Sequence, residues 1–347
     1  MILGMIVRMD KTGLGNQTRE LAEMLKPSKI LIIDSRPFKH ENEQFPEWYK
    51  DFPVQMISHG FPSSREKNWL LAGIDTLLTC EIPYGYEIIA AAKHRGIKTF
   101  IQYNYEFLDY LHDKRLPMPT KLISPSSWGV EEVENVLKVK PVILRPPIDT
   151  ERFKEARLRN AQRASKRRFL HIQGAKAIHD RNGTETLLKA IQLTNSDFEI
   201  VIKSQGAPDE TLMDPRIVYD NGNPENNEAL YYDFDAVIMP RRYGGLCLPM
   251  NESLAAGLPV IMTDIEPNRD LLPSKWLIPA HKIGDFMTRT MIDIYEADAQ
   301  AIADKIDEIC EMSDSDLLVE KFAAGKIADD NFSRESLVNK YKEVLGD

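Results

Sequence analysis

The sequence has few cysteines, and they are poorly placed for either of the usual structural roles. Cys80, Cys247 and Cys310 are the three in 347 residues. They are odd in number, lie far apart and show no metal-ligand spacing. The fold is therefore expected to depend neither on disulfides nor on a structural zinc ion, which fits a reduced compartment.

Long apolar runs are also missing. No stretch approaches the roughly 18 consecutive apolar residues that a membrane-spanning helix needs. The first ten residues, MILGMIVRMD, contain an apolar run, but it has the length of a strand, includes Arg8 and lacks a signal-peptidase site. The sequence predicts a cytoplasmic protein without a membrane span.

An excess of positive charge is absent as well. Lys and Arg number 44 against 53 Asp and Glu, so the net charge is −9 and the isoelectric point lies near 5.4. Nonspecific attraction to nucleic acid or to anionic membranes is not the default expectation for such a chain. One basic run, between Arg159 and Arg168, holds five cationic residues and no acids, and we expect it to form a solvated surface.

The hydrophobic residues that are present, 43% of the chain, alternate between short runs and amphipathic segments. Residues 1–7 form an apolar run, a turn containing Gly13 and Gly15 follows, then a helical pattern and a second run at 29–33. This strand–helix–strand order recurs in both halves of the chain, which is typical of buried parallel sheets. Helices are expected from about residue 284 to 345.

The predicted fold is α/β, with two doubly wound Rossmann-like domains. A proline-punctuated stretch at 140–149 separates the halves. Residues 1–145 are expected to form the N-terminal domain and 146–325 the C-terminal one. Residues 326–347 are expected to form a terminal helix that packs back on the N-terminal domain.

Residues 240–264 carry the most specific pattern. They follow a predicted strand and lead into a helix. Gly244 and Gly245 allow close approach of the backbone to a ligand, and Glu252 is expected in the first turn of the helix. There its carboxylate either complements the helix dipole or accepts hydrogen bonds from a ribose diol. An anionic group would suit the amides just before the helix, those of Leu246, Cys247 and Leu248.

This stretch resembles the signature of family 4 retaining glycosyltransferases of the GT-B fold, with two Rossmann-like domains facing across a cleft. The resemblance implies a nucleoside diphosphate sugar as donor in the C-terminal domain, with Glu252 on its ribose, and a hexosyl- or pentosyltransferase (EC 2.4) that retains configuration. The sequences of residues 13–18, 180–184 and 240–246 resemble segments of glycosyltransferases encoded by tailed bacteriophages, which implies the host cytoplasm as location. The positions that match in register are Pro240, Gly245, Leu248, Glu252, Ala255, Gly257, Pro259, Val260 and Ile261.

One position departs from the family pattern. The family has a pair of glutamates eight residues apart, and the first of these positions is Gly244 here. In the family that carboxylate is associated with the transferred sugar. We expect Arg241, Arg242 or Tyr243 to take over part of its contact.

The leaving diphosphate needs positive charge, because charge develops on it during transfer. The family places an Arg and a Lys after the first strand of the second domain, and Lys176 and Arg181 stand there as the catalytic candidates. Lys203 is a third candidate for donor binding. Gly13 and Gly15 match a glycine turn that the family has near the donor.

In the N-terminal domain, Asn104 and Glu106 follow a predicted strand and are candidates to contact the acceptor or the transferred sugar, as is Glu81 after the preceding strand. The resemblance leaves modified phage DNA, a virion protein or a glycan as acceptor. Nucleic acid is thus open as a partner but is not indicated by the net charge. His171 and His179 are expected to be packing or surface residues.

Three other interpretations have some support. The Asp233-Phe234-Asp235 motif is similar to a metal-binding DxD motif but precedes its strand, so we expect no metal and no cofactor beyond the donor co-substrate. Gly13, Gly15 and Asp34 suggest an NAD-dependent enzyme, but Thr18 replaces the third glycine. The missing first glutamate is compatible with a noncatalytic protein that binds nucleotide sugars.

Overall fold

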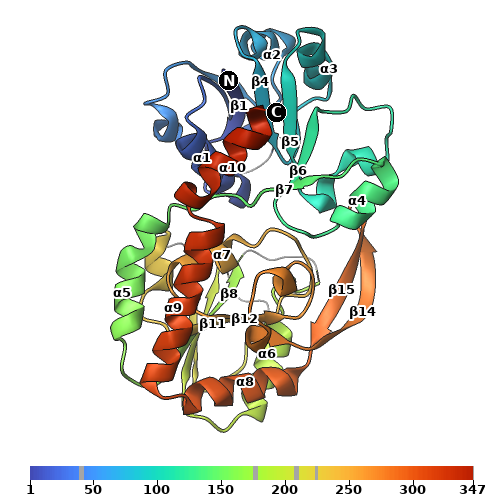
Figure 1. Ribbon diagram of the computed structural model, residues 1–347. Helices are drawn as coiled ribbons and strands as arrows, with labels where there is room; N and C mark the ends of the chain where they lie inside the picture. The colour runs from blue at the N-terminus through green and yellow to red at the C-terminus, as the bar shows by residue number, and fades with distance from the viewer. Residues whose placement is uncertain (39–42, 175–178, 207–210, 223–225, 347) are drawn as a thin grey trace. The chain divides into compact units, whose positions relative to one another are not determined.

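The computed structural model describes most of the chain (Figure 1). It divides into two compact units, and the chain first passes from one to the other between Pro147 and Ile148. Unit 1 comprises Met1–Pro147, Thr288–Thr290 and Arg334–Asp347, and unit 2 comprises Ile148–Met287 and Met291–Ser333. The residues described are 1–38, 43–174, 179–206, 211–222 and 226–346.

Unit 1 is built on a parallel seven-stranded sheet in the order β3-β2-β1-β4-β5-β6-β7. Its central strands are continuous apolar runs that are buried on both faces, as the sequence predicts for a sheet covered by helices. The strands are β1 (Leu3–Arg8), β2 (Lys29–Asp34), β3 (Gln55–His59), β4 (Thr76–Cys80), β5 (Lys98–Gln102), β6 (Lys121–Ser124) and β7 (Val142–Ile143). The helices are α1 (Gly13–Leu25), α2 (Ser64–Leu71), α3 (Glu87–His94), α4 (Val130–Leu137) and α10 (Arg334–Gly346).

The two early glycines lie in the first turn of α1 and not in a loop before it. Thr12 caps the helix by accepting a hydrogen bond from the Gly15 amide. A Cβ atom on Gly15 would lie 1.8 Å from the carbonyl oxygen of Asp10. Gly15 is therefore required by the close contact between α1 and the end of β1, whether or not a ligand binds nearby.

The last helix, α10, is an integral part of unit 1. The hydroxyl of Tyr341 accepts a 2.7 Å hydrogen bond from Gln102 Nε2 at the end of β5, and the Tyr341 ring is fully buried. Arg334 at the start of the helix forms ion pairs with Glu20 and Glu23 of α1. The core of unit 1 thus joins residues from both ends of the chain.

Unit 2 repeats the arrangement with a six-stranded parallel sheet in the order β10-β9-β8-β11-β12-β13. Two doubly wound α/β units are therefore present, and the predicted fold class is confirmed. The strands are β8 (Arg168–Gly174), β9 (Glu199–Ser204), β10 (Ile217–Asn221), β11 (Ala236–Met239), β12 (Val260–Thr263) and β13 (Leu277–Ile278). The helices are α5 (Lys154–Gln162), α6 (Thr184–Leu193), α7 (Leu248–Ala255), α8 (Ala299–Glu311) and α9 (Asp314–Asn331).

A β-hairpin occupies part of the region expected to be helical. Strands β14 (Ala280–Met287) and β15 (Met291–Ala297) pair in an antiparallel sheet. The expectation of helices from residue 284 is wrong up to residue 297, because Ile292 and Ile294 alternate with polar residues at the period of a strand. The tip of the hairpin, Thr288–Thr290, belongs to unit 1, where the Thr288 hydroxyl donates a hydrogen bond to the Glu106 carbonyl (3.0 Å).

The basic run, which begins within α5, is only in part the solvated surface that the sequence predicts, since Arg159 and Lys166 are exposed and the others are not. All five of its cations pair with carboxylates, and Arg167 is buried. The run could not reveal this, because its partners lie between 31 and 147 residues away along the chain. The pairs are Arg159–Asp233, Arg163–Asp235, Lys166–Asp197, Arg167–Asp314 and Arg168–Glu199.

Candidate functional site

Ligands of doubly wound sheets bind where the strand order reverses, outside the carboxyl ends of the strands. In unit 2 this point lies between the adjacent parallel strands β8 and β11. The loops after these two strands are tied together, since the Arg242 amide donates to the Arg181 carbonyl at 2.9 Å. A Cβ atom on Gly183 would lie 2.1 Å from the Pro240 carbonyl oxygen, so the close approach of the loops needs this glycine.

Two guanidinium groups meet over Gly244. This glycine has a φ of +113°, and a Cβ atom on it would lie 2.5 Å from Arg241 Nη2 and 2.6 Å from Arg181 Nη2. Arg241 is held by its own loop, donating to the Tyr243 carbonyl at 2.9 Å and to the Leu246 carbonyl at 3.2 Å. The Arg181 guanidinium lies over the Tyr243 ring, 5.2 Å from its centroid. The site therefore concentrates positive charge beside a glycine backbone.

The N-terminus of α7 follows directly. Its N-cap residue Cys247 makes no side-chain hydrogen bond to the helix, and Pro249 at the second position has no N–H. By contrast, α6 begins with its amides engaged, because Asp180 accepts from Thr184 N at 3.0 Å and from Glu185 N at 2.9 Å. Burial raises the pKa of Asp180. Of these two helix starts, α7 is the one suited to an external anion.

Glu252 lies one turn further along α7. It is the fifth residue of the helix, so its expected place in the first turn is wrong, and dipole complementarity does not explain it. Its Oε1 accepts a 2.6 Å hydrogen bond from Asn227 Nδ2, and its Oε2 accepts one of 2.6 Å from the Tyr231 hydroxyl. Burial and the Glu252 carboxylate raise the pKa of Tyr231 far above its usual range, so this donor stays protonated. The carboxylate is thus fixed in orientation.

The other predicted cations of unit 2 do not gather at Gly244 in the same way. The Arg242 guanidinium donates to the His179 carbonyl at 3.1 Å and lies 3.8 Å from Glu296. Lys203 pairs with Asp220 on β10 at 2.6 Å. Lys176 lies outside the described residues. Among the described candidates, Arg181 and Arg241 are the two predicted cations that lie at Gly244.

In unit 1 the strand order reverses between β1 and β4, and polar residues gather there too. Asn104 Nδ2 lies 3.4 Å from Glu81 Oε1, so these two predicted residues are together. Glu81 has a φ of +63°, and its burial raises the pKa of the carboxyl. Arg8 at the end of β1 pairs with Asp10. Glu106 contributes its carbonyl to the hairpin tip, accepting from the Thr288 hydroxyl and the Arg289 amide.

The two histidines are structural or peripheral, as expected. His171 is fully buried on β8, with Nδ1 2.8 Å from the Ile238 carbonyl and Nε2 2.9 Å from the Thr184 hydroxyl. Burial lowers the pKa of its imidazole to about 4, so the ring is neutral near pH 7. His179 is exposed and packs beside the Phe286 ring, 5.0 Å between centroids.

The DxD motif lies at the amino end of β11, opposite the loops that hold Gly244. Asp235 is fully buried and accepts from the Arg168 amide (2.9 Å), the Arg163 guanidinium (2.6 Å) and the Lys321 ammonium (2.8 Å). Asp233 pairs with Arg159 at the surface. The motif is structural, as the sequence order indicates. No cluster of three or more metal-ligating side chains occurs among the described residues.

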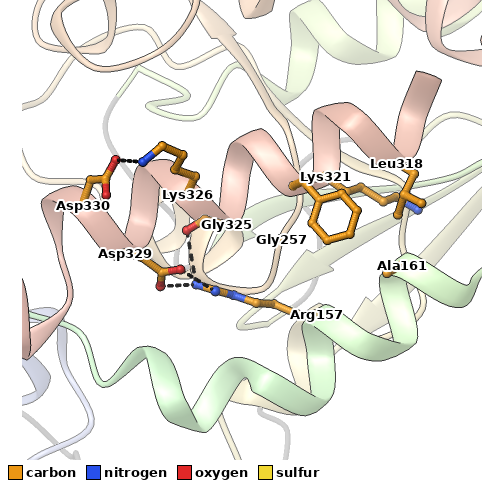
Figure 2. Close-up of a pocket in the computed structure, with 10 residues that line it drawn as sticks. Arg157, Ala161, Gly257, Leu318, Lys321, Gly325, Lys326, Asp329 and Asp330 are labelled. Atoms are coloured by element: carbon orange, nitrogen blue, oxygen red, sulfur yellow. Dashed lines mark hydrogen bonds and ion pairs between the residues drawn. The ribbon is translucent and has the colours of Figure 1, made fainter. Parts of the chain in front are cut away.

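A pocket of about 370 Å³ lies between α5 and α9, drawn in Figure 2. Arg157 bridges the two helices there through its ion pair with Asp329 (2.7 Å). Lys321, which also lines the pocket, donates to Asp235 and so marks the amino end of β11. The pocket is therefore separate from the carboxyl edge at which Arg181, Gly244 and Glu252 lie.

Comparison with known protein families gives a match within unit 2. Residues 170–312 match the model of the family described as glycosyl transferases group 1. This range includes Arg181, Gly244 and Glu252. No curated protein matches the chain in sequence.

Solved structures match over almost the whole chain. A glycosyltransferase from Rickettsia africae superposes with a TM-score of 0.70 at 13% identity, covering 99% of this chain and 97% of its own. The fold is GT-B. HepE from Anabaena, solved in complex with UDP, matches with a TM-score of 0.68 at 12% identity over 100% of both chains. Sucrose-phosphate synthase from Thermosynechococcus elongatus matches with a TM-score of 0.66 at 12% identity, over 99% and 97%.

The family match and the structural neighbours together support a glycosyltransferase of the GT-B fold. Two residues of the candidate site, Asn227 and Tyr231, carried no signal of their own in the sequence. Asn227 and Tyr231 lie 25 and 21 residues before the glutamate they hold. Arg241 was one of three neighbouring candidates, and only the conformation of its loop selects it.

In the part of the chain that is described, we find no helix with both the length and the apolar character needed to span a membrane.

Proposed function

We propose that this protein transfers a glycosyl unit, a hexose or pentose, from a nucleoside diphosphate sugar to an acceptor. The observation that carries the proposal is the meeting of Arg181 and Arg241 over Gly244, next to the N-terminus of α7. Such an arrangement is suited to a diphosphate, which is anionic and gains charge as it leaves. HepE, which shares the fold, was solved with UDP and with UDP-glucose, and this supports a nucleotide sugar as donor.

Each group at the site has a proposed part in the reaction. Glu252 accepts hydrogen bonds from the ribose diol, and Asn227 and Tyr231 keep its carboxylate in place. The backbone from Gly244 through Gly245, Leu246 and Cys247 to Leu248 approaches the phosphates and the sugar.

As the bond from the anomeric carbon to the diphosphate oxygen breaks, an acceptor hydroxyl oxygen bonds to that carbon and its proton passes to the departing diphosphate. The electron pair of the broken bond leaves with the diphosphate, and Arg181 and Arg241 stabilise it. Lys176 is proposed to assist. Retention of configuration is part of the proposal and rests on the resemblance to family 4.

We also propose that the transfer needs no metal ion. The two carboxylates that could be mistaken for a metal site are occupied by Arg159, Arg163 and Lys321 at the other end of β11. The cations at Gly244 supply positive charge where a divalent ion would otherwise be required. Transfer that is unchanged by EDTA is expected, and strict dependence on Mn²⁺ or Mg²⁺ would contradict it.

The setting proposed for the reaction is the cytoplasm, and the host cytoplasm if the chain is phage-encoded. The three cysteines are free thiols in the structure, which is compatible with a reducing compartment.

A donor screen tests the proposal. Thermal shifts are measured with UDP-, GDP-, ADP- and dTDP-sugars and with NAD(H), followed by assays of donor hydrolysis and transfer. At least one sugar nucleotide is expected to raise the melting temperature and to be turned over. A shift with NAD(H) alone would show a dinucleotide-dependent enzyme instead. Binding without hydrolysis or transfer would favour a noncatalytic nucleotide-sugar-binding protein, which the glycine at position 244 keeps as the second candidate.

A further inference from the structure

Three loops at the carboxyl edge of the unit 1 sheet each bring an aromatic ring to one place. Phe38 follows β2, Phe61 follows β3 and Tyr84 follows β4. The rings of Phe38 and Phe61 meet edge to face at 4.8 Å, and Tyr84 lies 6.5 Å and 6.3 Å from them. We call these three rings the aromatic platform. We propose that the platform binds an uncharged sugar ring of the acceptor, so that the acceptor is a glycan or glycoside.

The platform presents a fixed apolar face to solvent. Phe61 is 64% exposed, whereas Tyr84 beneath it is 4% exposed. The preceding Gly60 has a φ of +84°, donates its amide to the Asp34 carbonyl at 3.0 Å and sits where a Cβ atom would be 3.2 Å from Pro37. The turn therefore fixes the backbone that carries Phe61, and the Phe61 ring contacts the Phe38 ring edge to face. An aromatic side chain has only two torsions to order on binding.

Hydrogen-bonding groups follow the same edge of the sheet. Glu81 and Tyr84 both follow β4, and Asn104, which follows the adjacent strand β5, donates to Glu81 at 3.4 Å. A sugar ring has one face of C–H groups, which packs on an aromatic ring, and a rim of hydroxyls, which needs donors and acceptors. Aromatic rings at the same sheet edge as a carboxylate and an amide offer both kinds of contact.

The charges at this edge favour a neutral ligand over a phosphodiester. Arg8 is paired with Asp10 at 2.5 Å, and Arg36 is paired with Asp34 at 2.6 Å. With Glu81, these described residues are three carboxylates against two guanidinium groups, and the His59 imidazole also lies against Asp34 at 2.9 Å. A nucleic acid or a sulfated glycan would need a surplus of cations here.

The inference rests on the proposed function in identifying the bound sugar as the acceptor, but sugar binding itself can be tested alone. Saturation-transfer NMR on the full chain is measured with the methyl glycosides of glucose, galactose, mannose and N-acetylglucosamine, and with a thymidine oligonucleotide. At least one glycoside is expected to bind, with the strongest transfer to protons on one ring face. Phe61→Ala is expected to weaken that binding about tenfold or more, and Phe61→Tyr, which keeps a ring, to restore most of it.

Phe322→Ala is the matched control, because Phe322 is 67% exposed but lies on α9 of unit 2. It is expected to leave glycoside binding unchanged. The proposal is overturned if no glycoside binds, if the oligonucleotide binds instead, or if Phe61→Ala and Phe322→Ala behave alike. Thermal shifts with sugar nucleotides on the same samples separate the two proposals. Donor binding without glycoside binding would contradict only the proposal for the aromatic platform. Glycoside binding without donor binding would contradict only the proposed transferase function.

Discussion

At the scale of single residues, Gly244 is where this chain departs from the proteins it resembles, and its surroundings explain the departure. A side chain there would run into Arg181 and Arg241, so a carboxylate at this position is incompatible with both guanidinium groups in their present places. The glycine at position 244 therefore goes together with the two guanidinium groups, since their present places leave no room for a side chain. The site is positive where the family pattern expects a carboxylate.

Gly244→Ala is expected to impair the site far more than the fold. The backbone conformation costs any L-residue roughly 1–2 kcal/mol, and the new methyl group must also displace Arg181 or Arg241. We expect donor turnover to fall about a hundredfold. Gly73→Ala is the matched control, because Gly73 has a φ of +79° and open space around its Cβ position. It should lose similar stability in urea without losing turnover. Equal activity losses in the two variants would contradict the role given to Gly244.

Tyr231→Phe tests whether the orientation of Glu252 matters. Removing the hydroxyl takes one of the two described hydrogen bonds from the carboxylate, and a bond to a charged group is worth about 1.5–3 kcal/mol. We expect the dissociation constant of the donor to rise about tenfold or more, as measured by calorimetry. Tyr110→Phe loses a hydroxyl bonded to the Pro117 carbonyl in unit 1 and serves as control. A donor affinity unaltered by Tyr231→Phe would show that Glu252 is not a ribose ligand or needs no support.

At the scale of elements, α10 shows how the end of the chain stabilises its beginning. Leu337, Tyr341 and Leu345 are buried against the unit 1 core. Tyr341 also joins Gln102 to the carbonyls of Leu144 and Arg145. The helix therefore completes a domain whose strands and other helices all precede unit 2 in the chain.

Tyr341→Ala is expected to destabilise unit 1 by about 3–5 kcal/mol, since it opens a cavity in place of a buried ring. Urea unfolding followed by tryptophan fluorescence measures the loss, because three of the four tryptophans, Trp48, Trp69 and Trp128, lie in unit 1. Lys340→Ala, one residue away on the exposed face, should change stability by less than about 0.5 kcal/mol. If the two substitutions have equal effects, α10 does not pack as described.

At the scale of the whole molecule, the buried imidazole of His171 makes the free energy of unfolding depend on pH. The pKa of His171 is about 4 in the folded chain, below the roughly 6.5 expected once unfolded. The contribution of the neutral His171 to the free energy of unfolding is fully present above pH 6.5, where the imidazole is neutral in both states. It is lost as the pH falls from 6.5 to about 4, because the unfolded chain then binds a proton that the folded chain does not.

The loss in the free energy of unfolding that His171 causes is of the order of 3 kcal/mol by pH 4. Chemical denaturation of the wild type and of His171→Gln across this range measures it, and the variant should show a shallower pH slope whatever its absolute stability. Replacing the surface residue His94 by Gln should leave the slope as in the wild type. The same slope in all three proteins would mean that His171 is not buried in neutral form.

The sequence by itself determined the fold class, because alternating apolar runs and helical patterns are local and each strand of a parallel sheet carries its own signal. It also marked Glu252 and the glycine turn, whose pattern lies within some twenty residues. Only the tertiary structure decided which cations meet at Gly244, which side chains hold Glu252 and which carboxylates neutralise the basic run. The hairpin at 280–297 was predicted as helix, because each of its strands is short and is stabilised by pairing with the other. Residue spacing along a chain predicts local structure. The contacts at Gly244, at Glu252 and in the basic run join residues tens to hundreds of positions apart, so only the tertiary structure shows them.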